Sequence, residues 1–294
     1  MLNDENKSLI TKQRAWLHGE IIRRGVLAVN TDGVATNADK GNRPSKAIAA
    51  NLAAQLMSET HERQAGQTSG ATFEVLISEF LRRTLPKLQH IRPGEWEVAQ
   101  LGNRSSIKTS SFVQYEHLDY LQKLTEANSV LKTTLGNDYM VAPDVVVYRH
   151  PIPDEEINQP FEVVDGESAT LTEIRSEYND KPLLLASVSA KWTMRSDRAQ
   201  NSRTEALNLI RNRKGRVPHI VVVTGEPLPS RIASLALGTG DIDCMYHFAL
   251  YELIKAVEEY GKEGGREDIV EQLDTLVVGK RLKDISDLPL DLCI

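Results

Sequence analysis

The hydrophobic positions of the chain change their spacing about halfway along its length. Residues 51–60 and 71–85 carry apolar side chains at helical spacing, and residues 112–131 continue this pattern. Three short runs rich in β-branched residues follow, at 140–148, 183–190 and 220–224. This order predicts an N-terminal helical region followed by the strands of a buried sheet.

Two further helical patterns accompany these strands. Residues 198–211 lie between the last two runs, which is typical of a crossover helix in a mixed sheet. Residues 241–260 predict a helix beyond the sheet, with Thr239 or Asp241 as its N-cap. His247 lies in this apolar stretch, so we expect a core or interface histidine.

The segment 150–181 is polar and begins with prolines, so it could link two domains. We interpret it as an insertion, because the strands on either side carry residues that suit one active site. The prediction is therefore a single α/β domain over residues 1–294. It has a central mixed β-sheet flanked by helices, with helical N-terminal and C-terminal additions.

Composition and charge narrow the classes of protein. No apolar run approaches the roughly 18 residues of a membrane helix, and the N-terminus lacks the apolar core of a signal peptide, so we expect a cytoplasmic protein with no membrane partner. The net charge of −6 alone argues against a nucleic-acid partner. Residues 191–216 reverse that impression, because they hold eight basic and two acidic residues, and six of the basic ones are arginine. A solvated helix face could look the same, but arginine suits phosphate and guanine edges.

Two predicted strands carry polar residues where a core should be apolar. Pro143-Asp144 lies within the first, and Ser189-Ala190-Lys191 closes the second. An acid in an apolar strand is costly without a metal, a proton or a partner. Strand alternation points Ser189 and Lys191 to one face, where Lys191 could meet Asp144. Carboxylates that hold Mg²⁺ and a cation that orients water are parts that phosphodiester hydrolysis needs.

These residues resemble a variant of the PD-(D/E)XK nuclease motif. Pro143-Asp144, Ser189-Ala190-Lys191 and Glu205 are similar to the motif of type IIF restriction endonucleases that read CCGG. In that family a serine replaces the acid before the lysine, and a glutamate on the following helix takes over its role. The segments 66–74 and 189–213 and the C-terminal GKRLKDISDLPLDL look like the members that cut GCCGGC. The resemblance implies a restriction-endonuclease-like core and a Mg²⁺-dependent type II site-specific deoxyribonuclease.

The resemblance also implies catalytic roles. Lys191 would orient or polarise the attacking water, and Ser189 marks the vacated acid position. Two Mg²⁺ ions would be held by the carboxylates of three residues and the carbonyl of a fourth: Asp144, Glu205, Glu74 and Ala190.

Base contacts are implied in the same way. The inner CCGG would be read by Arg195, Asp197 and Arg198. Their chemistry is suitable, because arginine donates to guanine O6 and N7 and aspartate accepts from cytosine N4. The outer pair would be contacted by Arg231, Asp39 and Gln67. Lys40-Gly41 departs from the Gly-Ser that follows the equivalent aspartate, so the outer pair is less closely specified.

The resulting hypothesis is an enzyme that cuts both strands of GCCGGC after the first G and leaves 5′-CCGG overhangs. A palindrome suits a homodimer, and the resemblance implies a homotetramer and a cognate DNA methyltransferase within a restriction-modification system. The apolar residues 244–257 could bury the subunit interface or the core.

Two alternatives stay open at this point. A structure-specific repair or recombination nuclease of the same fold would not need the 195–198 element. A non-catalytic DNA-binding protein would leave Asp144, Lys191 and Glu205 unexplained. Fold alone does not choose among them.

Overall fold

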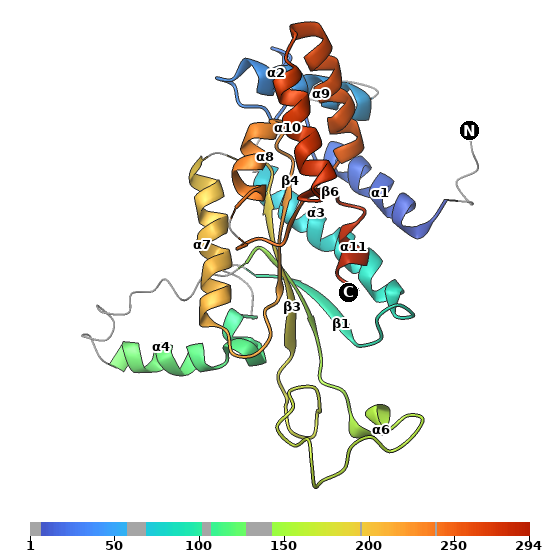
Figure 1. Ribbon diagram of the computed structural model, residues 1–294, viewed down its shortest axis with the longest axis vertical. Helices are drawn as coiled ribbons and strands as arrows, with labels where there is room; N and C mark the ends of the chain where they lie inside the picture. Colours follow the sequence, from blue (N-terminus) through green and yellow to red (C-terminus); the bar gives the residue numbers. More distant parts are fainter. Residues whose placement is uncertain (1–6, 58–68, 102–106, 128–142, 195, 239) are drawn as a thin grey trace.

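The computed structural model describes residues 7–57, 69–101, 107–127, 143–194, 196–238 and 240–294, with the side chains of 196–199 left aside. Among these residues a six-stranded sheet forms the centre of the fold (Figure 1), in the order β1 to β6. Its strands are β1 Trp96–Gln100, β2 Val145–Arg149, β3 Leu183–Lys191, β4 His219–Thr224, β5 Cys244–His247 and β6 Leu282–Asp284.

The sheet is mixed, which confirms the predicted fold class. β2 pairs antiparallel with β1 and β3, whereas the strands from β3 to β6 run parallel to one another. The first four residues of β2 and the last five of β4 are all buried. Such continuous apolar runs are expected where helices cover both faces of a sheet.

The described residues form ten α-helices, of which all but the short α6 in the arm lie around the body that contains the sheet. They are α1 Leu9–Arg23, α2 Arg43–Leu56, α3 Ser69–Thr84, α4 His117–Ala127, α6 Asp154–Ile157, α7 Ser196–Asn212, α8 Pro229–Ala236, α9 Leu250–Gly264, α10 Glu267–Val278 and α11 Leu288–Asp291. α3 packs against β1, β2 and β3, and Figure 1 shows α7 on the other side of the strands. No helix in the described part of the chain is both long and apolar enough to cross a membrane.

Several predicted elements shift or change. The helices over 51–60 and 71–85 appear as α2 and α3, and the crossover helix appears as α7. The helix over 241–260 is wrong in its first half, because Cys244–His247 is strand β5 and the helix α9 starts at Leu250. The four β5 residues pair in parallel with β4, which overrides their helical apolar spacing. The predicted cap fails for the same reason: Asp241 precedes a strand, and Thr239 lies outside the described residues.

The segment between β2 and β3, residues 150–182, forms an arm that extends from one end of the molecule (Figure 1). Arg175 is 1% exposed and organises this arm. Its guanidinium donates to both carboxylate oxygens of Asp154 and to the carbonyls of Asp165 and Ser168. The arm leads into the first residue of β3, whereas Lys191 is the last residue of that strand. The arm and Lys191 therefore lie at opposite ends of β3.

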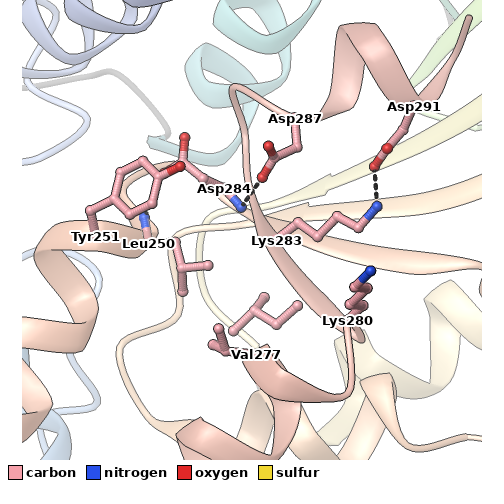
Figure 2. A pocket seen from close by; sticks show the side chains of 9 residues that line it. Leu250, Tyr251, Val277, Lys280, Lys283, Asp284, Asp287 and Asp291 are labelled. Atoms are coloured by element: carbon pink, nitrogen blue, oxygen red, sulfur yellow. Dashed lines mark hydrogen bonds and ion pairs between the residues drawn. The ribbon is translucent and has the colours of Figure 1, made fainter.

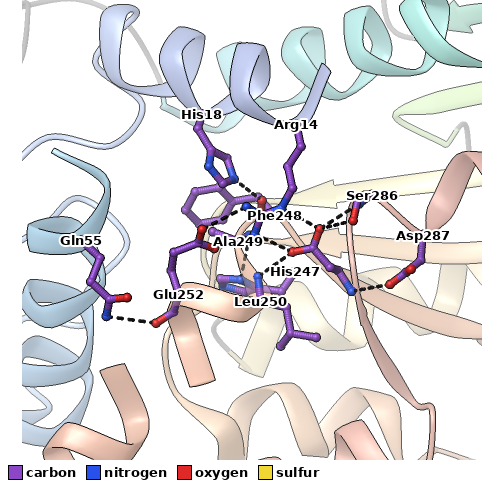
Figure 3. Close-up of polar contacts among 11 residues, drawn as sticks. Arg14, His18, Gln55, His247, Phe248, Ala249, Leu250, Glu252, Ser286 and Asp287 are labelled. Carbon is purple, nitrogen blue, oxygen red and sulfur yellow. Dashed lines mark hydrogen bonds and ion pairs between the residues drawn. The ribbon is translucent and has the colours of Figure 1, made fainter. Parts of the chain in front are cut away.

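A polar network ties α1 to the C-terminal elements (Figure 3). Arg14 donates to Asp284 at 2.9 Å and to Glu252 at 2.5 to 3.0 Å. The Asp284 carboxylate is fully buried and also accepts the backbone N–H of Leu250 at 2.9 Å. His247 is fully buried beside this network, as expected of a core histidine. The network therefore fixes α1 against α9 and β6.

Candidate active site

Asp144 and Lys191 meet where β2 begins and β3 ends. Nζ of Lys191 lies 2.8 Å from Oδ2 of Asp144, and the two side chains are 16% and 17% exposed. Asp144 immediately precedes β2 instead of lying within it, since the strand starts at Val145. The antiparallel pairing of β2 with β3 brings the two residues together.

Three more of the predicted residues join this pair. The backbone N–H of Ala190 donates to Oδ2 of Asp144 at 2.8 Å. Oγ of Ser189 lies 3.4 Å from the same oxygen and 3.3 Å from Oε2 of Glu205 on α7. The serine hydroxyl therefore stands between the two carboxylates, at the place where the usual motif has an acid.

Glu74 reaches the same site from α3. A pocket of about 220 Å³ is lined by Glu74, Lys191 and Glu205 together with Gly70, Ala190, Trp192 and Asn201. Three separate elements thus supply charged groups to one cavity.

Burial and crowding shape the electrostatics of this pocket. Burial, together with the charge of Asp144, raises the pKa of Glu74 to about 7. Burial also raises the pKa of Glu205, against the opposing effect of Lys191. Burial alone would lower the pKa of Lys191, but Asp144 and Glu205 outweigh it and raise that pKa. The lysine therefore stays an ammonium, whereas Glu74 and Glu205 favour a proton or a further cation beside them.

The donor set fits a hard divalent cation. Among the described residues no three acidic, histidine or cysteine side chains form a ready-made ion cluster. Within the described chain, all hydrogen bonds to the Asp144 carboxylate go to Oδ2, so Oδ1 is available as a ligand. Carboxylate and carbonyl oxygens are the ligands that Mg²⁺ takes, and an added cation would offset the burial and the charge of Asp144 that together raise the pKa of Glu74.

The predicted outer readers form a separate pair. Arg231, the third residue of α8, makes an ion pair with Asp39 in the turn before α2. Both side chains are about one quarter exposed, at 26% and 27%. Arg231 also lies 3.8 Å from Glu226, a buried acid that the sequence analysis missed. Glu226 is separated from the apolar strand β4 by one glycine. A polar residue at the end of an apolar strand is the same signal that indicated Asp144 and Lys191.

The remaining predicted readers are not placed. Arg195 and Gln67 lie outside the described residues. Asp197 and Arg198 fall in the first turn of α7, whose backbone alone is described there.

A second hollow, of about 310 Å³, lies beside β6 (Figure 2). Its acids and Lys283 already bond to protein: Lys283 pairs with Asp291 at 2.6 Å, Asp287 accepts the N–H of Asp284, and Asp284 accepts a hydrogen bond from Arg14. β6 is three strands away from β3. We therefore assign no chemistry to this second hollow.

Comparison with known proteins decides the family. The sequence profile of the NgoMIV restriction enzyme family matches residues 17–294. The chain belongs to the NgoMIV restriction enzyme family. One relative, described as the type II restriction enzyme NgoMIV of Neisseria gonorrhoeae, is 51% identical over 287 residues, covering 97% of this chain and 99% of the relative. This member of the NgoMIV family is accordingly a type II restriction enzyme, that is, a site-specific deoxyribonuclease with a restriction-endonuclease-like fold.

Two solved structures are also similar to the chain. The pre-specific restriction endonuclease BsaWI in complex with DNA gives a TM-score of 0.27 at 11% identity, covering 68% of this chain and 65% of that one. The restriction endonuclease PspGI with substrate DNA gives 0.24 at 12% identity, covering 99% and 96%. The assignment to the NgoMIV family rests on the sequence matches. It favours a restriction enzyme over both a repair nuclease and a non-catalytic DNA-binding protein.

Proposed function

We propose that this enzyme hydrolyses one phosphodiester bond in each strand of the palindrome GCCGGC, after the first G, and leaves 5′-CCGG overhangs. The observation that supports this most directly is the convergence of Asp144, Lys191 and Glu205 at the end of β3 in a type II restriction enzyme. Carboxylates beside one ammonium are the set that phosphodiester hydrolysis requires.

The catalytic roles follow from the contacts. Asp144, Glu205 and Glu74 would hold two Mg²⁺ ions, with the Ala190 carbonyl as a further ligand. When bound, these ions would acidify water and stabilise charge on the phosphate. Lys191 keeps its proton because of the acids around it, so it orients the attacking water by donating a hydrogen bond.

Sequence would be read by two groups of side chains. Arg195, Asp197 and Arg198 would contact the inner CCGG. Arg231 and Asp39, with Gln67, would contact the outer pair. The ion pair between Arg231 and Asp39 supports this, because arginine suits guanine and aspartate suits cytosine within one G·C pair.

Self-association is the second part of the proposal. A palindrome offers two equivalent bonds, which suit two identical sites in a homodimer, and two dimers would form a homotetramer. The arm exposes four large hydrophobic side chains that an interface would cover: Phe161 at 69%, Val163 at 55%, Leu171 at 96% and Tyr178 at 47%. We further propose that residues 1–294 act as one domain, in the cytoplasm, alongside a methyltransferase that protects the same site.

End-sequencing tests the cleavage proposal. The purified protein is incubated with plasmid DNA and Mg²⁺, and the fragment ends are sequenced. We expect each end to begin with CCGG and to restore GCCGGC on ligation. Ends at another sequence, or cutting without Mg²⁺, would contradict the proposal.

A further inference from the structure

Glu226 is a buried carboxylate outside the catalytic set. It is fully buried and follows β4 after Gly225. Its Oε2 accepts the backbone N–H of Met194 at 2.8 Å, and its Oε1 accepts that of Leu228 at 3.2 Å. Burial raises the pKa of Glu226 to about 7, and the two backbone hydrogen bonds and the charge of Arg231 oppose that rise, so these contacts are what favour the carboxylate.

The two backbone groups belong to the two reading elements. Met194 immediately precedes Arg195, the first of the proposed inner readers. Leu228 is the N-cap residue of α8, the helix that carries Arg231. Nη1 of Arg231 also lies 3.8 Å from Oε2 of Glu226. One carboxylate therefore contacts the start of one reading segment and the guanidinium of the other.

The surroundings of Glu226 leave the two segments little freedom. Oγ1 of Thr224 donates to the Lys191 carbonyl at 2.8 Å, which joins the ends of β3 and β4. A Cβ at Gly225 would stand 2.4 Å from the ring of Trp192, so only glycine allows this approach. Nδ2 of Asn37, two residues before Asp39, donates to the Gly225 carbonyl at 2.8 Å. The strand ends and the Asp39 turn are thus joined directly.

We propose that Glu226 is a positioning residue for base readout, which sets the backbone entering the 195–198 segment and the guanidinium of Arg231 in one fixed relation. The inference rests on the proposed reading roles of these residues. It adds that inner and outer readout depend on a single side chain that touches no base.

A carboxylate suits this position better than the amide of the same size. Both of its oxygens accept, so it satisfies two backbone N–H groups and attracts Arg231 at once. The amide of glutamine would present an NH₂ group either to a backbone N–H or to the guanidinium. Glu226→Gln should therefore loosen the two reading elements without leaving a cavity, because the side chain keeps its size.

Equilibrium binding without Mg²⁺ tests the proposal. Fluorescence anisotropy gives the Kd of wild-type and Glu226→Gln protein for duplexes containing GCCGGC, the outer-altered ACCGGT and the inner-altered GCATGC. We expect Glu226→Gln to lose about tenfold in discrimination against both altered duplexes, the size of one good base contact. In an Arg231→Ala background the same change should lower only the inner discrimination further.

Asp284→Asn is the matched control. Like Glu226, Asp284 is fully buried, pairs with an arginine and accepts hydrogen bonds from backbone N–H groups, but it lies on β6. We expect it to lower the Tm while leaving discrimination at the wild-type value. If Glu226→Gln unfolds at the assay temperature, Glu226→Asp, which keeps the charge but is one methylene shorter, replaces it under the same comparison.

The outcomes separate this inference from the proposed site. A Glu226 variant that has a lower Tm but discriminates as the wild type does would overturn the positioning role alone. A wild-type protein with no preference among the three duplexes would overturn the GCCGGC site and this inference together.

Discussion

The ammonium of Lys191 lies 2.8 Å from Oδ2 of Asp144 although the two residues are 47 positions apart in the chain. The whole arm lies between them, and the antiparallel pairing of β2 with β3 closes that loop. The strands on either side of the arm therefore bring together two residues of one site, which is the reason we interpret the arm as an insertion.

Catalysis should depend on this pair more than binding does. We expect Asp144→Ala or Lys191→Ala to slow cleavage by at least about a thousandfold, since each removes a group that acts only once DNA is bound. In metal-free gel-shift assays both should bind the specific duplex within about tenfold of wild type, and Asp144→Ala should bind it more tightly because a charge facing the phosphate is gone. The exposed acid Glu258 on α9 supplies a control, Glu258→Gln, that should cut normally. Near-normal cleavage by either site variant would remove the assignment.

Residues that read bases and residues that contact only phosphates should have different effects on DNA binding. Arg195→Ala, Asp197→Ala and Arg198→Ala should each lose about 1–3 kcal/mol of discrimination against changes within CCGG. Lys214→Ala should weaken binding to all duplexes alike and flatten its salt dependence. Anisotropy titrations at several salt concentrations measure both effects. An Asp197→Ala protein that rejects altered inner pairs as strongly as wild type would show that Asp197 reads no base.

The arm offers a direct test of assembly. Leu171→Asp and Phe161→Asp place a charge on its most exposed apolar positions, so we expect them to split tetramers into dimers in light scattering. Wild-type enzyme should cut a two-site plasmid faster than a one-site plasmid, because the second site is present at high effective concentration. The variants should lose that advantage and keep single-site cutting. A wild-type monomer with equal rates on both plasmids would refute self-association.

The Arg14 network should control stability toward acid. Burial alone would raise the pKa of Asp284, but the hydrogen bonds from Arg14 outweigh it and lower that pKa, as they lower the pKa of Glu252. Carboxyls with a lowered folded-state pKa stabilise the protein above their unfolded pKa of about 4, and this contribution is lost as the pH falls further.

Arg14→Met removes the partner and leaves both carboxylates unpaired. We expect a loss of about 3 kcal/mol in the free energy of unfolding at pH 7. The difference from wild type should shrink as the pH falls below about 4, where protonation removes the advantage of the pair. Urea titrations at pH 7 and pH 3.5 measure both values. A constant difference at the two pH values would mean that the arginine stabilises by packing alone.

The sequence predicted those parts of the fold whose local pattern agrees with their place in the sheet. The β-branched runs became β2, β3 and β4, because strands buried on both faces need continuous apolar residues. β5 was missed because its four residues continue into the apolar face of α9, so the period along 241–260 appears helical throughout. β1 and β6 carry polar residues within five and three positions, so neither forms a β-branched run like that of β2.

The site was predictable for a related reason. Asp144 and Lys191 are polar residues at the ends of apolar strands, where only function or a partner compensates their burial. The bond from Ser189 to Glu205 required the fold, since it depends on how α7 lies across the sheet. The stretch 244–257, equally suited to an interface or the core, belongs to the core, because Leu250, Leu253 and Val257 of α9 are buried within the single chain.

The parallel pairing of β3 with β4 sets Lys191 opposite Thr224, so the proposed catalytic lysine and the segment that leads to Glu226 leave the sheet as neighbours. A mutation that distorts the ends of β3 and β4 should therefore impair cleavage and base readout together. A damaged copy of the gene then yields an inert protein and not a nuclease that has lost its sequence preference. If a methyltransferase protects the chromosome only at the recognition site, as we propose, that is the safer way for the enzyme to fail.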